Sequence, residues 1–404
     1  MGVIFLLILF YILNQFIFNF YKKKHSFFER KKMDLLYLYH LLFFGIFLWY
    51  SFNNPADSKR YYEDMEYFEG TWLELLGTDT LFINFVSYPF YRLGFSYSML
   101  MLTFAWFGYL GFVYAYVFMS EKIPVKVKVF KRLDLLTLIL FFPNMHFWTS
   151  ALGKDSLIFM GLMMFTYAII NPKSRIFLLI LSSLVVFYIR PHVFMFVAVG
   201  VVIGYLSGKE KIPFWKKATI SLGMVLVLTL VMDDVLNVMG LGESENIVED
   251  FQSESGERSK SLSTSGSGVD MSNYPLPFKF FTFWFRPLFI DAPNILGIIT
   301  SFENLIYLLL FFKILKKDFI KFLRRSPSLI KMSFVIFILS SFALTFVMSN
   351  LGIIMRQKSM VMYFIFFVIY YYLAQKKYRR YLKYKAYKLR QKKEAAVRGQ
   401  ISPT

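Results

Sequence analysis

The sequence lacks cysteine entirely and has only four histidines among its 404 residues. The absence of cysteine excludes disulfides, thiolate metal ligands and a cysteine nucleophile. The sequence also lacks a long polar segment that could bury a core of its own, so no separate soluble catalytic domain is available. Any chemistry must therefore come from polar and charged side chains within a chain that is 57% hydrophobic and 21% aromatic.

Apolar runs dominate the sequence. We count about 11 that are long enough, or nearly so, to cross the roughly 30 Å hydrocarbon core of a bilayer. They lie near residues 3–20, 34–52, 97–119, 134–151, 155–171, 175–189, 191–207, 218–236, 293–312, 331–348 and 357–374. This pattern predicts an all-α, polytopic membrane protein in which residues 1–375 form a single transmembrane domain.

The basic residues are divided unevenly between the two sides of these runs. If every run crosses once, about three quarters of the 46 Lys and Arg residues fall on one side. Basic loops remain in the cytoplasm, which predicts an outside N-terminus and a cytoplasmic C-terminus. A net charge of +20 could also indicate nucleic acid, but the basic residues lie at span ends, where anionic lipid head groups are found. Membrane orientation is therefore the favoured interpretation, and no nucleic-acid partner is predicted.

Three segments lie outside the apolar runs. Residues 376–404 form a basic cytoplasmic tail, in which tyrosines spaced three apart among Lys and Arg predict an amphipathic helix on the inner leaflet. Extracytoplasmic loops are predicted near residues 53–96 and 237–292. In the second loop, residues 243–270 are rich in Ser, Gly and Glu, which predicts either a mobile flap or disorder.

Charged residues embedded in or beside the spans are the strongest functional candidates. A charge at membrane depth is costly and usually faces a cavity. On the predicted outer side these residues are Lys154, Asp155, Arg190, His192, Arg286, Asp291, Glu303, Arg356 and Lys358. Their position on one side predicts a site that opens outward.

Three of these residues are arginines: Arg190 and Arg356 lie in short turns between apolar runs, and Arg286 lies at the outer end of an aromatic stretch. If they converge without an equal set of acids, they form an anion site, because guanidinium offers planar paired donors that fit phosphate oxygens. A lipid-linked pyrophosphate at the outer leaflet would suit such a site. The alternative is structural, with each arginine reaching the head groups or pairing with a nearby carboxylate.

Residues 142–156 break an apolar run with a proline, several polar groups and the adjacent pair Lys154 and Asp155. Gly153 and Lys154 lack the spacing of a phosphate-binding loop, which excludes nucleotide binding by that motif. The segment predicts a kinked helix end, where the Lys-Asp pair begins the next helix. The pair has a binding role or an architectural role, and a carboxylate there would be stabilised by the helix dipole in either case.

Four short motifs carry a family resemblance. They are Phe-Pro-Asn-Met-His-Phe-Trp-Thr-Ser-Ala-Leu-Gly-Lys-Asp-Ser at 142–156, Ile-Arg-Pro-His at 189–192, Phe-Arg-Pro-Leu-Phe-Ile-Asp-Ala-Pro-Asn at 285–294 and Ser-Phe-Glu-Asn at 301–304. In this order, and over about residues 30–375, the chain resembles the bacterial Wzy-type polysaccharide polymerases and the related EpsG-like proteins.

This resemblance implies an inner-membrane enzyme with an all-α, GT-C-like fold. Such enzymes join oligosaccharide repeat units carried on undecaprenyl pyrophosphate, lengthening an O-antigen, capsule or exopolysaccharide at the outer face. It implies that Arg190, Arg286 and Arg356 handle the lipid pyrophosphate and the sugars, with no metal or nucleotide cofactor. The implied partners are the lipid-linked oligosaccharide, membrane lipids, a flippase and a chain-length regulator.

The expected reaction is glycosyl transfer, in which a sugar hydroxyl attacks the anomeric carbon and pyrophosphate departs. Arginines holding the pyrophosphate would stabilise the transition state more than the ground state. The candidate general bases are, in order, His192, Glu303 and Asp57. For His192 the alternative is a hydrogen-bonded turn histidine. Further substrate-binding candidates are Lys154, Asp155 and Lys358.

Other functions compete with polymerisation. A carrier would need a route to both faces, whereas the embedded charges here lie on one side. An O-antigen ligase, or another transferase that uses a lipid-linked sugar, would use the same donor chemistry with a different acceptor. A non-catalytic scaffold would leave the arginines without a ligand.

Overall fold

The computed structural model describes residues 1–210, 213–238, 247–264, 267–271, 273–292 and 294–400. The chain is about 79% helical. The strands found in the described residues are two residues long each and form one antiparallel pair. The fold class is therefore all-α, as the apolar runs predict.

The elements of the described residues are named in chain order. They are α1 (Gly2–Lys24), α2 (Arg30–Asn53), α3 (Asp57–Glu66), η1 (Trp72–Leu75), α4 (Thr80–Arg92), α5 (Tyr97–Lys122), β1 (Lys128–Val129), β2 (Leu133–Asp134), α6 (Leu135–Leu140), α7 (Pro143–Thr149), α8 (Lys154–Ala168), η2 (Pro172–Ser174), α9 (Ile176–Ile189), α10 (Pro191–Ser207), α11 (Phe214–Leu230), α12 (Met232–Val238), α13 (Ile247–Ser263), α14 (Leu276–Phe285), α15 (Ile295–Phe311), α16 (Lys317–Arg324), α17 (Ser328–Val347) and α18 (Leu351–Gln400).

Of the described helices, five are long and apolar enough to cross a membrane: α1, α2, α5, α17 and the first part of α18. Shorter apolar helices are formed by residues 135–149, by α9, by α10 and by α15. The chain thus has the architecture of an all-α membrane protein. The count of about 11 spans stays a prediction, since many of the apolar runs form helices shorter than 18 residues.

The predicted break near residues 142–156 is confirmed. Pro143 ends the continuity between α6 and α7, because proline has no N–H to donate and fits best in the first turn of a helix. Gly153 then precedes α8 with φ of 157°, a conformation that glycine adopts without a side-chain clash. These two breaks set Lys154 and Asp155 in the first turn of α8.

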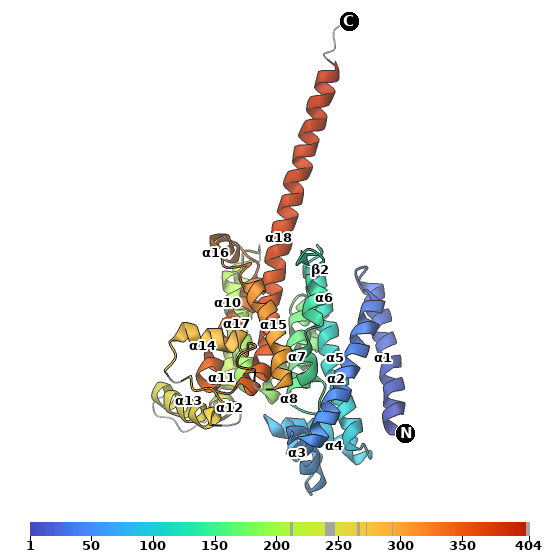
Figure 1. Cartoon of the computed structure of the whole chain (residues 1–404), viewed down its shortest axis with the longest axis vertical. Helices are drawn as coiled ribbons and strands as arrows, with labels where there is room; N and C mark the ends of the chain where they lie inside the picture. The colour runs from blue at the N-terminus through green and yellow to red at the C-terminus, as the bar shows by residue number, and fades with distance from the viewer. Residues whose placement is uncertain (211–212, 239–246, 265–266, 272, 293, 401–404) are drawn as a thin grey trace.

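The core is built around α5, α8 and the apolar part of α18. The backbone of α5 comes very close to the end of α7 at Gly108, where an added Cβ would lie 2.0 Å from the carbonyl oxygen of Thr149. Helices α1 and α2 lie at one edge of the molecule (Figure 1), and their outward faces expose large apolar side chains such as Phe5 and Leu38. Apolar faces of this kind suit contact with lipid.

Different sets of elements lie at the two ends of the molecule (Figure 1). Helix α16, strand β2 and the basic part of α18 lie at one end, called here the α16 end. Helices α3, α4 and α13 lie at the opposite, α3 end. Segments predicted to be cytoplasmic and extracytoplasmic are therefore separated along the longest axis of the body.

The basic tail is helical, as predicted, but it is not a separate helix. Helix α18 runs without interruption from Leu351 to Gln400, and Figure 1 shows it projecting far beyond the body. A helix lying flat on the inner leaflet would need a bend near residue 375, and α18 has none. The absence of Pro and Gly between residues 353 and 398 accounts for this continuity.

The two long loops contain more structure than predicted. Residues 53–96 hold α3, η1 and α4, and residues 237–292 hold α13 and α14. Of the two alternatives predicted for 243–270, disorder is wrong for residues 247–263, which form α13, while the mobile flap stays a prediction. Residues 243–246 and 265–266 lie outside the described residues. This segment docks on the end of α17, because the hydroxyls of Ser259 and Ser349 hydrogen-bond and Val269 N donates to Ser349 O at 2.8 Å.

Candidate functional site

A cavity of about 390 Å³ lies between α3, α8, α10, α13, α17 and the start of α18. The predicted site residues that line it are Asp57, Lys154, Arg190, His192 and Arg356. These residues, from Asp57 to Arg356, are far apart in the sequence but line one cavity, called here the charged cavity. Lys and Arg outnumber Asp and Glu among the lining residues.

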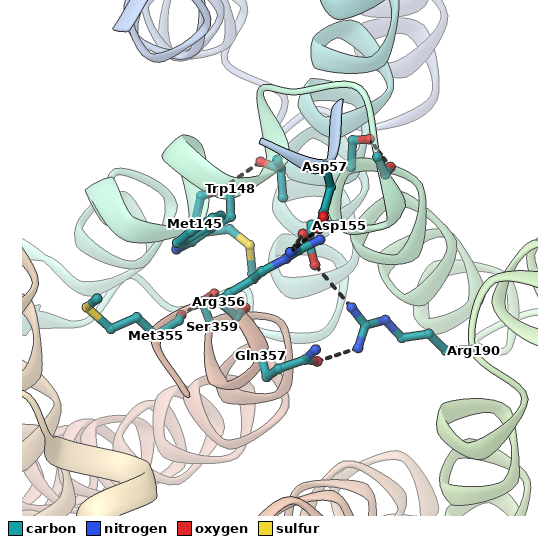
Figure 2. Close-up of polar contacts among 12 residues, drawn as sticks. Asp57, Met145, Trp148, Asp155, Arg190, Met355, Arg356, Gln357 and Ser359 are labelled. Atoms are coloured by element: carbon teal, nitrogen blue, oxygen red, sulfur yellow. Dashed lines mark hydrogen bonds and ion pairs between the residues drawn. The ribbon is translucent and has the colours of Figure 1, made fainter. Parts of the chain in front are cut away.

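Asp155 does not line the charged cavity, but it joins two of the arginines that do (Figure 2). Its carboxylate accepts hydrogen bonds from Arg190, at 3.3 Å, and from Nε of Arg356. The side chains of Asp155 and Arg190 are only 6% and 7% exposed. Since charges buried this deeply are costly alone, each holds the other in place. The first turn of α8 also favours a negative charge at Asp155.

Arg356 ties three elements together. Its Nε donates to Asp155 on α8, and its Nη1 donates to Asp57 on α3 at 3.0 Å. The guanidinium carbon lies 5.7 Å from the ring centroid of Trp148, within reach of a cation–π interaction. The planar fork of arginine makes this double attachment possible, whereas a lysine ammonium would be a single point charge.

One buried nitrogen of Arg190 has no hydrogen-bond partner among the described residues. Arg190 donates to Asp155 and to the side-chain oxygen of Gln357 (Figure 2), while its Nε is buried and has no hydrogen-bond partner in the described chain. Arg190 is placed at the cavity because Pro191 starts α10 directly after it. The turn predicted from the Arg-Pro-His motif is therefore present.

Lys154 is paired with a residue that the sequence analysis did not single out. Its ammonium donates to the carboxylate of Asp79, which also lines the charged cavity. Asp79 has φ of 62°, unusual for a residue other than glycine, and its N–H donates to the carbonyl of Tyr188 at 2.6 Å. Burial raises the pKa of Asp79, but the hydrogen bond and charge of Lys154 outweigh it and hold that pKa below its ordinary value. The sequence signal was its Gly-Thr-Asp-Thr turn at 77–80, which has too little specificity to be chosen alone.

His192 faces the charged cavity from the first turn of α10. Its ring meets Phe196 edge to face, with 6.4 Å between centroids. It forms no hydrogen bond with any part of the chain that the structure describes, which differs from a hydrogen-bonded turn histidine. Its position leaves it available to a substrate in the cavity.

Glu303 does not belong to the charged cavity. It is buried on α15, where it accepts a hydrogen bond from the backbone N–H of Asn144 at 2.9 Å and another from the hydroxyl of Tyr307. These contacts secure the N-terminus of α7 against α15. Glu303 is therefore separated from the arginines of the charged cavity, and its role as a general base stays a prediction.

Lys358 and Arg286 also lie apart from the charged cavity. Lys358 donates to the carbonyl of Arg286 and to the side-chain oxygen of Asn304, both at 2.7 Å, while Arg286 pairs with Asp291. The periodicity of α18 explains the separation, since residues two apart on a helix point in nearly opposite directions and Arg356 faces the cavity. The predicted convergence of all three arginines is wrong for Arg286.

The arginines are not the unpaired set that the anion-site hypothesis assumed. Arg190 and Arg356 share Asp155, Arg356 also pairs with Asp57, and Arg286 pairs with its own aspartate. The alternative stated for them, pairing with a carboxylate, therefore describes all three. The functional distinction is their setting, since only Arg190 and Arg356 of these three line the cavity.

A smaller cavity of about 210 Å³ lies on the other side of Arg356. Asp57 and Arg356 line both cavities, so this ion pair forms part of the boundary between them. The smaller one, called here the aromatic cavity, is lined in part by Phe47, Tyr50 and Trp148. The two cavities offer adjoining surfaces of different chemistry.

Among the described residues, no group of three or more His, Cys, Asp or Glu side chains is placed to hold a metal ion. Comparison of the chain with protein-family models, curated proteins and solved structures finds no match. The motifs of the sequence and the geometry of the two cavities therefore indicate the function.

Proposed function

We propose that this chain joins oligosaccharide repeat units carried on undecaprenyl pyrophosphate, at the outer face of a bacterial cytoplasmic membrane. The observation that carries the proposal is the charged cavity, where Arg190, Arg356 and Lys154 meet beside Asp57 and His192. The resemblance of the motifs at 142–156 and 189–192 to the Wzy-type polymerases supports the same function. In this proposal the α3 end of the molecule faces outward.

The pyrophosphate of the lipid-linked substrate would accept hydrogen bonds from those arginine N–H groups that have no partner within the described part of the protein. The carboxylate of Asp155 fixes both guanidinium groups, so that little reorientation is needed when an anion enters. The unpartnered Nε of Arg190 is buried beside the cavity and offers a hydrogen bond to a phosphate oxygen. Lys154 would add positive charge if its ammonium left the carboxylate of Asp79 and bound the pyrophosphate instead.

In the reaction, an acceptor hydroxyl oxygen attacks the anomeric carbon of the donor sugar and forms the new glycosidic bond. The bond from that carbon to the pyrophosphate oxygen breaks, and the pyrophosphate takes the electron pair. Negative charge grows on the leaving group, so the guanidinium groups stabilise the transition state more than the ground state. The hydroxyl proton passes to a base, for which Asp57 and His192 are the residues in place.

The aromatic cavity would receive the acceptor sugar. Apolar ring faces such as those of Tyr50 and Trp148 suit the apolar face of a sugar, while a nearby carboxylate can orient its hydroxyl groups. Asp57 borders both cavities and therefore lies between the two substrates in this arrangement. That position makes Asp57 the favoured base, ahead of His192.

The proposal is tested by the size of lipid-linked surface glycan in a deletion strain, resolved on a gel. The native chain should restore the long ladder, whereas Arg190→Ala and Arg356→Ala should leave single repeat units. The matched control is Arg92→Ala, an exposed arginine in the last turn of α4 that lies outside both cavities. Abundance in the membrane, measured by immunoblot, separates a catalytic loss from failure to fold.

Other outcomes would replace the proposal. Long polymer that accumulates without attachment to its final acceptor would indicate a ligase that uses the same donor. An unchanged ladder in the deletion strain would contradict polymerisation and favour a carrier. A full ladder from Arg356→Ala at normal abundance would remove the charged cavity from the reaction.

A further inference from the structure

Helix α18 leaves the body at the α16 end (Figure 1). Two basic clefts flank it there. The first, called here the α16 cleft, has a volume of about 400 Å³ and lies between α16 and α18. The second, the β1 cleft, also measures about 400 Å³ and lies between β1, the segment after α15 and α18. Lys376 and Arg380, one helical turn apart, line both clefts.

The cations in these clefts form no ion pairs within the described residues, although Asp318 also lines the α16 cleft. The α16 cleft adds Lys321 and Arg325 from the α16 region, and the β1 cleft adds Lys313 and Lys316. None of the Lys or Arg residues that line either cleft forms an ion pair within the described residues. Such a concentration of unpaired positive charge in a concave surface attracts an anion.

Each cleft also has apolar walls. Phe322 and Tyr372 line the α16 cleft, and Val127, Val129 and Leu373 line the β1 cleft. Tyr372 and Leu373 continue directly into the apolar, buried part of α18. A ligand that fits both features has an anionic head and an apolar remainder, and a free phosphate ion would use only the basic part.

We propose that the two clefts bind the phosphate head groups of anionic phospholipids, with the adjoining apolar part of each lipid against the apolar walls of the clefts. Basic pockets between helices at a membrane surface recognise lipid phosphates in this way. The proposal does not depend on the glycosyl-transfer function, because none of the residues that line the clefts lines the charged or the aromatic cavity.

The test uses the purified full chain in neutral detergent, titrated with phosphatidylglycerol or with phosphatidylcholine, with bound lipid counted by native mass spectrometry. The double variant Lys376→Gln with Arg380→Gln removes the charges shared by both clefts. The matched control, Lys388→Gln with Arg390→Gln, removes the same charge from exposed positions on the same helix, outside both clefts.

The first double variant should lower phosphatidylglycerol affinity at least about tenfold, and the control less than about twofold. Phosphatidylcholine should bind weakly to every form. Equal loss in both double variants would show diffuse attraction to the tail and overturn the proposal. So would inorganic phosphate competing as well as the lipid, or single-stranded RNA binding the same residues more tightly. An unchanged thermal unfolding midpoint shows that the variants remain folded.

Discussion

The charged cavity at the α3 end and the basic clefts at the α16 end both concentrate Lys and Arg. In the charged cavity Arg190 and Arg356 are paired with carboxylates, whereas the cations of the basic clefts form no ion pairs within the described residues. Arg190 is buried and shares Asp155 with Arg356, whereas Lys376 and Arg380 lie in open clefts without ion pairs. The physical reason is desolvation, since a charge removed from water needs a partner and an exposed one does not. A basic residue in the sequence therefore has different consequences at the two ends.

The difference also separates two kinds of recognition. Paired, buried guanidinium groups are held in a fixed orientation, which suits a reaction whose charge develops at a defined place. Open, unpaired cations offer attraction with little geometric demand, which suits lipid head groups and weakens as salt rises. Binding at the α16 end should accordingly be much more sensitive to ionic strength than donor binding in the charged cavity.

Removing the carboxylate of Asp155, which Arg190 and Arg356 share, should have the largest effect, a loss in the free energy of unfolding. Asp155→Ala leaves Arg190 buried without its partner, so we expect unfolding to become easier by about 3–5 kcal/mol. The measurement is thermal or denaturant unfolding of the purified protein in detergent. The matched control is Asp318→Ala, an exposed carboxylate lining the α16 cleft, which should change stability by less than about 0.5 kcal/mol. Similar losses in the two variants would contradict the comparison.

Replacing Arg356 by a lysine, which keeps the charge but changes the hydrogen-bond geometry, should have an intermediate effect, seen in polymer formation. Arg356→Lys retains a cation but cannot donate to Asp57 and Asp155 in the same planar arrangement. We expect polymer formation to fall about tenfold or more, which corresponds to roughly 1.4 kcal/mol in the barrier. The equivalent change in a basic cleft, Arg380→Lys, should leave phosphatidylglycerol binding within about twofold. Full activity of Arg356→Lys would show that charge alone is sufficient in the cavity.

Protonation of Asp79 at low pH should have the smallest effect, a small loss in the free energy of unfolding. Its folded pKa lies below its unfolded value, so the ion pair with Lys154 stabilises the protein above the unfolded pKa, and this stability is lost as pH falls through the folded pKa. Because the Asp79 side chain is 44% exposed, we expect about 1 kcal/mol or less. Asp79→Asn should remove that part of the acid sensitivity, as measured by unfolding midpoints between neutral and acidic pH. An unchanged acid profile in Asp79→Asn would contradict this assignment.

Local sequence signals located much of the charged cavity correctly. The prolines at the start of α7 and in the Arg-Pro-His motif predicted helix breaks, and the structure confirms these breaks. Lys154, Asp155 and Arg190 lie at the helix ends that follow or precede them. The prediction succeeded because proline acts on the backbone within one turn, whatever the surrounding fold. Asp79 escaped notice, since its role depends on a lysine 75 residues away.

The sequence by itself determined the all-α class, the apolar helices, the breaks around α7 and α8 and the separation of basic from acidic segments. These properties follow from composition and short-range periodicity, which do not depend on distant contacts. Only the tertiary structure decided which charges meet. Arg356 and Lys358 lie two positions apart on α18, yet one joins the charged cavity and the other is buried against Asn304, because helix rotation and packing direct them to different neighbours.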